Sequence, residues 1–141
     1  MDIEVTTEPS PEALETLSQG IQAYNRDTIP GFPEVAEELR FAVLARTSVG
    51  ELVGGIRAVA FWGYLSIELL WLSESARGRG IGTGLVRAAE AFAVQHGFEY
   101  ARVETTSFQA KPFYEKLGYD VFGSLENFPP GHRSYFLKKR L

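Results

Sequence analysis

Cysteine is absent from this 141-residue sequence, and histidine occurs only as His96 and His132. Without thiols the chain has no disulfide framework, thiolate metal site or cysteine nucleophile. Two histidines far apart in the sequence do not form a zinc-ligand pattern, so we expect no metal. No apolar run approaches the roughly 18 residues that a membrane span needs, and the N-terminus lacks the features of a secretory signal. These absences predict a cytoplasmic protein with no membrane partner.

Acidic side chains slightly outnumber basic ones, which gives a formal net charge of -4. This balance argues against a nucleic-acid partner and favours a cationic one, such as an amine. With 45% hydrophobic and 23% charged residues, the composition is that of an ordinary globular protein. We therefore expect a single domain over residues 1–141.

Hydrophobic periodicity predicts strands and helices throughout the chain. Three consecutive antiparallel strands joined by tight turns, a helical crossover and a final antiparallel strand pair together predict an α/β fold with a mixed sheet. Its sheet is mostly antiparallel with a central parallel strand pair and flanking helices. The doublet Gly54-Gly55 predicts a bulge or a close backbone approach. The predicted strands are residues 3–7, 41–46, 52–62, 64–73, 100–106, 119–123 and 134–138, and the predicted helices are residues 11 to about 25, 81 to about 97, and 109–117.

A glycine-rich crossing, Arg-Gly-Arg-Gly-Ile-Gly-Thr-Gly at residues 77–84, links an apolar strand to an amphipathic helix. The first amides of a helix have no partner inside it, and the helix dipole adds positive potential there. Glycines let an anion approach these amides, and Arg77 and Arg79 add charge and forked donors. The pattern predicts a phosphate-binding loop.

The spacing of the loop argues against two common nucleotide sites. A P-loop would place Gly-Lys-Ser/Thr here, and a dinucleotide fingerprint has other glycine spacings near the start of a chain. The remaining pattern, Arg-x-x-Gly-x-Gly at Arg77, Gly80 and Gly82, resembles the pyrophosphate loop of the GNAT superfamily of acetyl-CoA-dependent N-acetyltransferases.

Residues 107–119 resemble the second signature of the same superfamily. The matching positions are Ala110, Phe113, Tyr114, Leu117, Gly118 and Tyr119, whereas Ser107 stands where asparagine is common. With the preceding antiparallel strands, the resemblance covers nearly the whole chain. It implies acetyl transfer from acetyl-CoA to a primary amine on a small molecule or peptide, and a homodimer is common among such proteins.

The resemblance also implies a V-shaped opening between the two central parallel strands. Unpaired strand edges there would bind the extended amide arm of the cofactor. The backbone of Leu70 and Leu72 would face this arm, and the amides of residues 79–84 would hold the pyrophosphate. The implied cofactor-binding residues are Leu70, Trp71, Leu72, Arg77, Gly78, Arg79, Gly80, Ile81, Gly82, Thr83, Gly84, Ser107, Ala110 and Phe113.

Acetyl transfer needs a neutral amine, a polarised carbonyl and a proton for the departing thiolate. Since the chain has no cysteine, we expect direct transfer in a ternary complex. By resemblance Tyr114 is the acid. Glu68, which shares strand parity with Leu70 and so is expected to face the same side, is the first candidate base, and Glu104 is the second. The base acting through water, and an amine arriving deprotonated, remain alternatives, as does a non-catalytic acyl-CoA-binding module.

Overall fold

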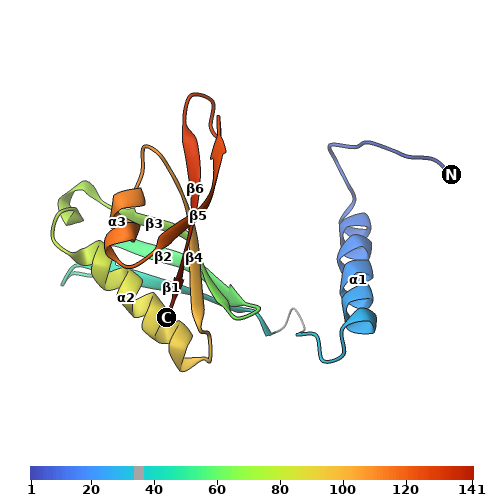
Figure 1. Cartoon of the computed structure of the whole chain (residues 1–141), viewed down its shortest axis with the longest axis horizontal. Coiled ribbons are helices and arrows are strands. Elements are labelled where there is room, and N and C mark those ends of the chain that lie inside the picture. The colour runs from blue at the N-terminus through green and yellow to red at the C-terminus, as the bar shows by residue number, and fades with distance from the viewer. Residues whose placement is uncertain (34–36) are drawn as a thin grey trace. The chain divides into compact units, whose positions relative to one another are not determined.

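A computed structural model describes residues 1–33 and 37–141. These residues form two compact units, Met1–Glu37 and Glu38–Leu141 (Figure 1). The first unit contains the helix α1 (Pro11–Thr28), which begins where the sequence predicts. The Ser10 hydroxyl accepts a hydrogen bond from the Ala13 N–H at 3.1 Å, as an N-cap residue does. No helix in the described ranges is long and apolar enough to cross a membrane.

The predicted first strand at residues 3–7 is wrong. The described part of the chain has no strand there, and the side chains of Ile3 and Val5 are 93% and 95% exposed. Alternating apolar residues show which side chains share a face, but a strand also needs a neighbour for its backbone hydrogen bonds. The sequence pattern contains no information about that neighbour.

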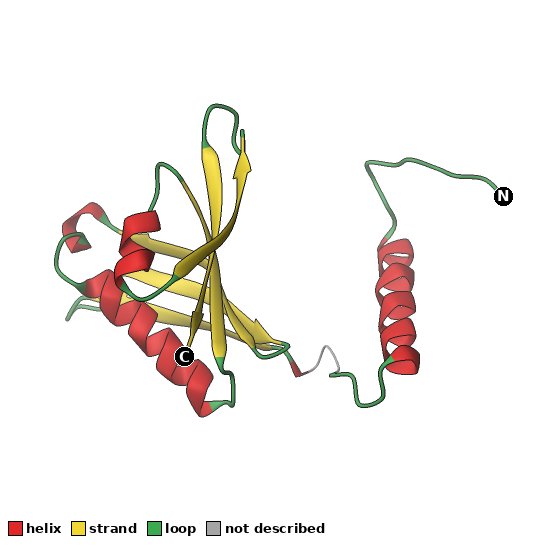
Figure 2. Cartoon of the chain, viewed as in Figure 1, coloured by secondary structure: helices red, strands yellow, loops and turns green. Residues whose placement is uncertain are grey.

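The second unit is built on one six-stranded sheet with the order β1-β2-β3-β4-β6-β5 (Figures 1 and 2). The β3–β4 pair is parallel and the other described pairs are antiparallel, which confirms the predicted mixed sheet. The strands are β1 (Leu39–Arg46), β2 (Leu52–Phe61), β3 (Tyr64–Leu72), β4 (Tyr100–Thr106), β5 (Asp120–Glu126) and β6 (Arg133–Arg140).

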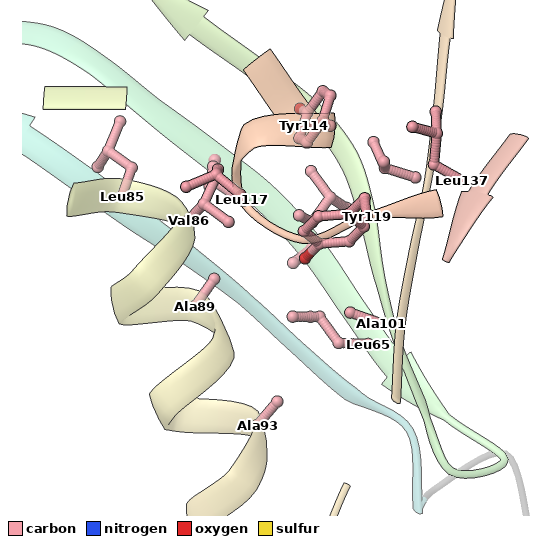
Figure 3. Packing of buried hydrophobic residues seen from close by; sticks show 14 residues of the cluster. Leu65, Leu85, Val86, Ala89, Ala93, Ala101, Tyr114, Leu117, Tyr119 and Leu137 are labelled. Carbon is pink, nitrogen blue, oxygen red and sulfur yellow. The ribbon is translucent and has the colours of Figure 1, made fainter. Parts of the chain in front are cut away.

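The described residues of this unit contain three helices, and each follows one of the parallel strands. The short 3-10 helix η2 (Glu74–Ala76) and α2 (Ile81–Gln95) connect β3 to β4, and α3 (Lys111–Lys116) follows β4. The buried face of α2 carries Leu85, Val86, Ala89 and Ala93, as its spacing predicts (Figure 3). These side chains belong to the same core cluster as Leu65 of β3.

Strand alternation separates the two faces of the sheet. On β2, Ile56 and Ala58 are buried in the core beneath α2, whereas Arg57 between them is exposed. On β4, Val103 is buried and Glu104 is exposed. We call the face toward α2 and α3 the helical face and the opposite one the outer face.

The glycine doublet on β2 marks a close approach of neighbouring strands. A Cβ added to Gly54 would lie 2.5 Å from Leu72 Cδ2 and 2.9 Å from the Trp71 carbonyl oxygen. The pairing of β1 with β2 also shifts register beside Gly54, between Ala45 and Arg46. Both features confirm the prediction for this doublet, and they lie beside the end of β3 that borders the candidate site.

Candidate active site

The parallel strands β3 and β4 pair over only part of their length. Their register runs from Tyr64 opposite Tyr100 to Ile67 opposite Val103, although β3 continues to Leu72 and β4 to Thr106. On its other side, β3 has one extra residue at Glu68, because Arg57 pairs with Leu69 and Ala58 with Ile67. Such a bulge bends a strand. The strands therefore part after Ile67, where the resemblance implied an opening.

A cleft of about 660 Å³ occupies this opening. Its walls come from the diverging ends of β3 and β4, the start of α2, and α3. The sequence-predicted residues that line it are Glu68, Leu70, Trp71, Leu72, Arg77, Gly82, Glu104, Ala110, Phe113 and Tyr114. The cleft thus brings together side chains that are far apart in the sequence.

The other loop residues lie outside this lining: Gly78, Arg79, Gly80, Ile81, Thr83 and Gly84. Gly80 is the N-cap of α2, with a left-handed φ of +77° that favours glycine. The first helical hydrogen bond runs from the Gly84 N–H to the Gly80 carbonyl oxygen at 3.1 Å. The amides of residues 81–83 precede that bond, so they are the donors available to an anion at this helix end.

Two predicted cofactor-binding residues, Leu72 and Ser107, have hydrogen-bond partners within the protein. The Leu72 carbonyl oxygen accepts a hydrogen bond from Arg77 Nε at 3.2 Å. Ser107 lies outside the cleft lining: its N–H donates to the Arg133 carbonyl oxygen at 2.7 Å, and its hydroxyl accepts from the Arg133 N–H at 3.2 Å. Ser107 therefore joins the end of β4 to the start of β6.

Tyr114 lies on α3, and its side chain is directed into the core cluster beside Tyr119 (Figure 3). It is only 4% exposed, yet it also lines the cleft. The two rings meet edge to face with centroids 5.7 Å apart. Burial raises the pKa of Tyr114 to about 12. The phenol is therefore protonated at every ordinary assay pH.

Glu68 and Glu104 line both the cleft and a second hollow on the outer face. Glu68 Oε2 lies 3.8 Å from Nε of Arg57, whereas Leu70 packs against the core. The prediction that Glu68 and Leu70 face the same side of the sheet is therefore wrong. The bulge at Glu68 interrupts the alternation of side chains along β3. Within residues 1–33 and 37–141, no hydrogen bond or ion pair engages the Glu104 carboxylate.

Sequence reasoning missed several residues that line the cleft, namely Ile67, Leu69, Val103, Thr105 and Gln109. Most lie next to predicted residues, but no pattern in the sequence distinguishes them. Thr105 has a clear structural role, because its hydroxyl accepts a hydrogen bond from the Ala110 N–H at 3.1 Å. That contact holds the start of α3 against β4 and so helps to place Tyr114.

No group of three or more histidine, aspartate or glutamate side chains that could hold a metal occurs among the described residues. The polar groups that converge on the cleft are instead Arg77, the two carboxylates and the phenol of Tyr114. This is a donor and acceptor set suited to proton transfer and anion binding.

Comparison with known proteins identifies the family of this chain. The family model described as Acetyltransferase (GNAT) family matches residues 4–119. A relative from Streptomyces morookaense, a blasticidin-S acetyltransferase, is 40% identical over 102 residues, which cover 72% of this chain and 75% of the relative.

Solved structures share the fold. An acetyltransferase from Bacillus cereus superposes with a TM-score of 0.87 at 27% identity, over 98% of both chains. A putative streptothricin acetyltransferase from Bacillus anthracis, solved in complex with acetyl coenzyme A, gives a TM-score of 0.65 at 20% identity over 72% of this chain and 62% of that one. The fold is thus shared with solved acetyltransferases, and this chain belongs to the GNAT family of acetyltransferases.

Proposed function

We propose that this protein transfers the acetyl group of acetyl-CoA to a primary amine of a small molecule or peptide, directly and with both substrates bound. The observation that carries this proposal is the cleft between the parted strands, which has the start of α2 and Tyr114 on its walls. Membership of the family and the fold shared with an acetyl-CoA complex support the choice of donor. We take residues 1–141 as one catalytic domain, since the family match begins in the first unit and ends in the second.

The residues present fit an acyl-CoA molecule. A Cβ added to Gly82 would lie 3.4 Å from Leu72 Cδ1 and from the Phe113 ring, so glycine keeps this wall of the cleft clear. The amides of residues 81–83 and the Arg77 guanidinium would hold the diphosphate. Beyond Ile67 the edge of β3 no longer pairs with β4, so its backbone at Leu70 would hold the extended amide arm.

Bound acetyl-CoA supplies the thioester carbonyl that the amine attacks; the carbon–sulfur bond breaks, and the proton lost by nitrogen ends on sulfur. A phenol with a pKa of about 12 keeps its proton and can donate a hydrogen bond, but it is a weak acid. Giving its proton outright to a thiolate, whose conjugate acid has a pKa of about 8.5, would be uphill by roughly 5 kcal/mol. Tyr114 therefore donates a hydrogen bond to sulfur as charge develops there, and any proton that it passes on is replaced from the amine.

The amine proton needs an acceptor near the gap between β3 and β4. Glu68 and Glu104 are both there, on the boundary between the cleft and the outer hollow. Glu104 has its carboxylate free for a ligand within the described chain, while Glu68 faces Arg57 at 3.8 Å. We assign the base to these two carboxylates and expect Glu104→Gln to lower turnover more than Glu68→Gln.

The test is release of free CoA, followed with a thiol reagent, across a panel of amines. Blasticidin S belongs in the panel because the Streptomyces relative is named for it. The expected result is thiol release that depends on the amine and saturates with acetyl-CoA. Binding of acetyl-CoA without thiol release for any amine would instead identify a non-catalytic acyl-CoA-binding module. Competition of ATP or NAD with acetyl-CoA would instead indicate that the glycine loop binds a nucleotide.

A further inference from the structure

The outer face of the sheet has a hollow of its own, of about 330 Å³, directly behind the cleft. The two cavities share Ile67, Glu68, Val103 and Glu104, the residues at which β3 and β4 part. The cleft also has walls from α2 and α3, whereas the hollow is walled by Arg57 and other outer-face residues. A molecule in the hollow would therefore reach the thioester through the gap from the side opposite the helices.

The charges in this hollow are ordered along β4. Glu104 lies at the gap, and Arg102 lies two residues away on the same face, at roughly 7 Å along the strand. Lys138 of β6 is the direct neighbour of Arg102 in the sheet, and Phe136 is the neighbour of Glu104. The carboxylates thus lie nearest the gap through which the thioester would be reached, and the cationic side chains of Arg102 and Lys138 lie one pair of residues further along β4 and β6.

Arg102 keeps most of its donors for a ligand. Its Nε donates to the Ser66 hydroxyl at 2.7 Å, which fixes the guanidinium on the sheet. No carboxylate among the described residues forms an ion pair with Arg102 or Lys138. By contrast, Arg57 has Glu68 within 3.8 Å. Arg102, which lines this hollow, and Lys138, its neighbour in the sheet, therefore have no carboxylate of the described residues within ion-pair distance, so their charge is available to a substrate.

An adjoining hollow of about 510 Å³ continues from the 330 Å³ hollow and shares Arg102 and Phe122 with it. Lys138 lines it too, together with the aromatic side chains of Phe61, Trp62 and Tyr64. Lys138 Nζ lies 5.5 Å from the centre of the Phe122 ring. This part of the surface suits a flat or apolar group that carries negative charge, because aromatic walls and cations occur together.

We propose that the acceptor is an amine that also carries an anionic group, a carboxylate or a phosphate. Its amine lies at Glu68 and Glu104 beside the gap, and its anionic group binds Arg102 and Lys138, with the body of the molecule against Phe122. This inference rests on the proposed acetyl transfer and adds the substrate class. A simple cationic amine would use only the acidic end and would leave the two cations without a role.

Matched amines test the inference on the full chain. The probes are 4-(aminomethyl)benzoate, its phosphonate counterpart, and 4-methylbenzylamine, which has the same amine but no anionic group, each assayed by release of CoA. We expect kcat/KM for at least one anionic probe to exceed that for 4-methylbenzylamine by about tenfold or more, since a charge-assisted contact contributes roughly 1.5–3 kcal/mol. The better anionic probe identifies the anion.

Variants locate the preference. Arg102→Gln and Lys138→Gln should each lower kcat/KM for the anionic probe about ten- to a hundredfold. They should change kcat/KM for 4-methylbenzylamine less than about threefold. Both variants should also bind the anionic probe more weakly in calorimetry. Arg102→Lys should restore part of the loss. Arg87→Gln, which removes one charge from the exposed face of α2, is the matched control and should leave the preference intact.

The outcomes separate the two proposals. Equal use of the probes with and without an anionic group by the wild-type protein would overturn the anionic acceptor and leave acetyl transfer standing. A uniform loss with all probes in both the Arg102→Gln and Lys138→Gln variants would do the same. Absence of CoA release with every amine would overturn the proposed function, and the substrate class with it.

Discussion

At the scale of single residues, Tyr114 is held by contacts that leave its phenol little freedom. Its N–H donates to the Ala110 carbonyl oxygen at 3.1 Å, and its own carbonyl oxygen accepts from the Tyr119 N–H at 3.1 Å. The ring lies between Phe113 and Tyr119, both edge to face. Rigid placement is what a hydrogen-bond donor to developing charge requires, because reorganisation during the reaction would cost free energy.

Tyr114→Phe should lower kcat by about 10² or more while acetyl-CoA affinity changes little, because only the donated hydrogen bond is lost. The measurements are steady-state kinetics with the best amine and calorimetric titration of acetyl-CoA. Tyr135→Phe, which removes a hydroxyl from β6 outside the cleft lining, is the control. Unchanged turnover in Tyr114→Phe would remove the phenol from the mechanism.

The pH profile offers an independent check on the same residue. Since burial raises the pKa of Tyr114 to about 12, its ionisation should not reduce activity below about pH 11. Any change in rate between pH 6 and 10 therefore belongs to the amine or a carboxylate, and Tyr114→Phe should show it at the same pH as the wild type. A change in activity near pH 9 that is present in the wild type and absent in Tyr114→Phe would contradict the raised pKa of Tyr114.

At the scale of elements, the start of α2 matters because its backbone amides are the proposed binding surface for the diphosphate. Gly82 is buried and lines the cleft, and its position just after the N-cap places it among the free helical amides. A side chain there would meet Leu72 and Phe113. The proposed diphosphate site therefore depends on the absence of a side chain at Gly82.

Gly82→Asp should raise the Kd for acetyl-CoA about a hundredfold or more, because it sets a carboxylate and extra bulk against the site assigned to the diphosphate. Isothermal titration measures this directly. Gly20→Asp is the matched control, since an added Cβ at Gly20 meets nothing within 4 Å and the same charge enters on α1. Normal acetyl-CoA binding by Gly82→Asp would place the cofactor elsewhere.

A buried ionic cluster links three elements behind the site. Glu90 on α2 accepts a hydrogen bond from the Tyr119 hydroxyl at 2.9 Å and from Lys139 Nζ on β6 at 2.9 and 3.2 Å. Glu90 is only 7% exposed. The cluster joins α2 to the segment that follows α3, so it supports the position of Tyr114 without touching the cleft.

Glu90→Ala should destabilise the protein by about 3 kcal/mol or more, because Lys139 would remain as a buried charge without its partner. Urea unfolding monitored by circular dichroism gives the value. The double variant Glu90→Leu/Lys139→Met, which removes both charges, should be more stable than Glu90→Ala. Equal loss in both proteins would show that packing, and not the unpaired charge, dominates.

At the scale of the whole molecule, two buried tyrosines set an alkaline limit to stability. Burial raises the pKa of both Tyr114 and Tyr119, and the neighbouring Glu90 carboxylate raises that of Tyr119 further. Above pH 10 the unfolded chain loses these protons while the folded chain keeps them. The unfolded state is then favoured, so the free energy of unfolding falls as pH rises.

Between about pH 10 and 12 each such tyrosine should contribute a slope of up to about 1.4 kcal/mol per pH unit. Denaturant unfolding of the wild type and of Tyr114→Phe over this range isolates one of them. The variant should lose stability more slowly with pH, by up to about 1.4 kcal/mol less per pH unit. Parallel curves would mean that Tyr114 ionises equally easily in both states.

The sequence by itself determined the order of the elements, the mixed sheet, the buried face of α2 and the glycine loop, because periodicity, caps and turn residues act locally. It also placed Tyr114 and the glycine loop in one site through the two signatures. It was wrong about residues 3–7, where alternation lacked a partner strand.

Only the tertiary structure decided where β3 and β4 part, that Glu68 is the extra residue of a bulge, and that Arg77 holds the Leu72 carbonyl. It also decided that Arg102 and Lys138 are neighbours on the outer face. The physical reason is that register is set between strands. One extra residue turns the following side chains to the other face, and no single strand's sequence records what lies opposite it.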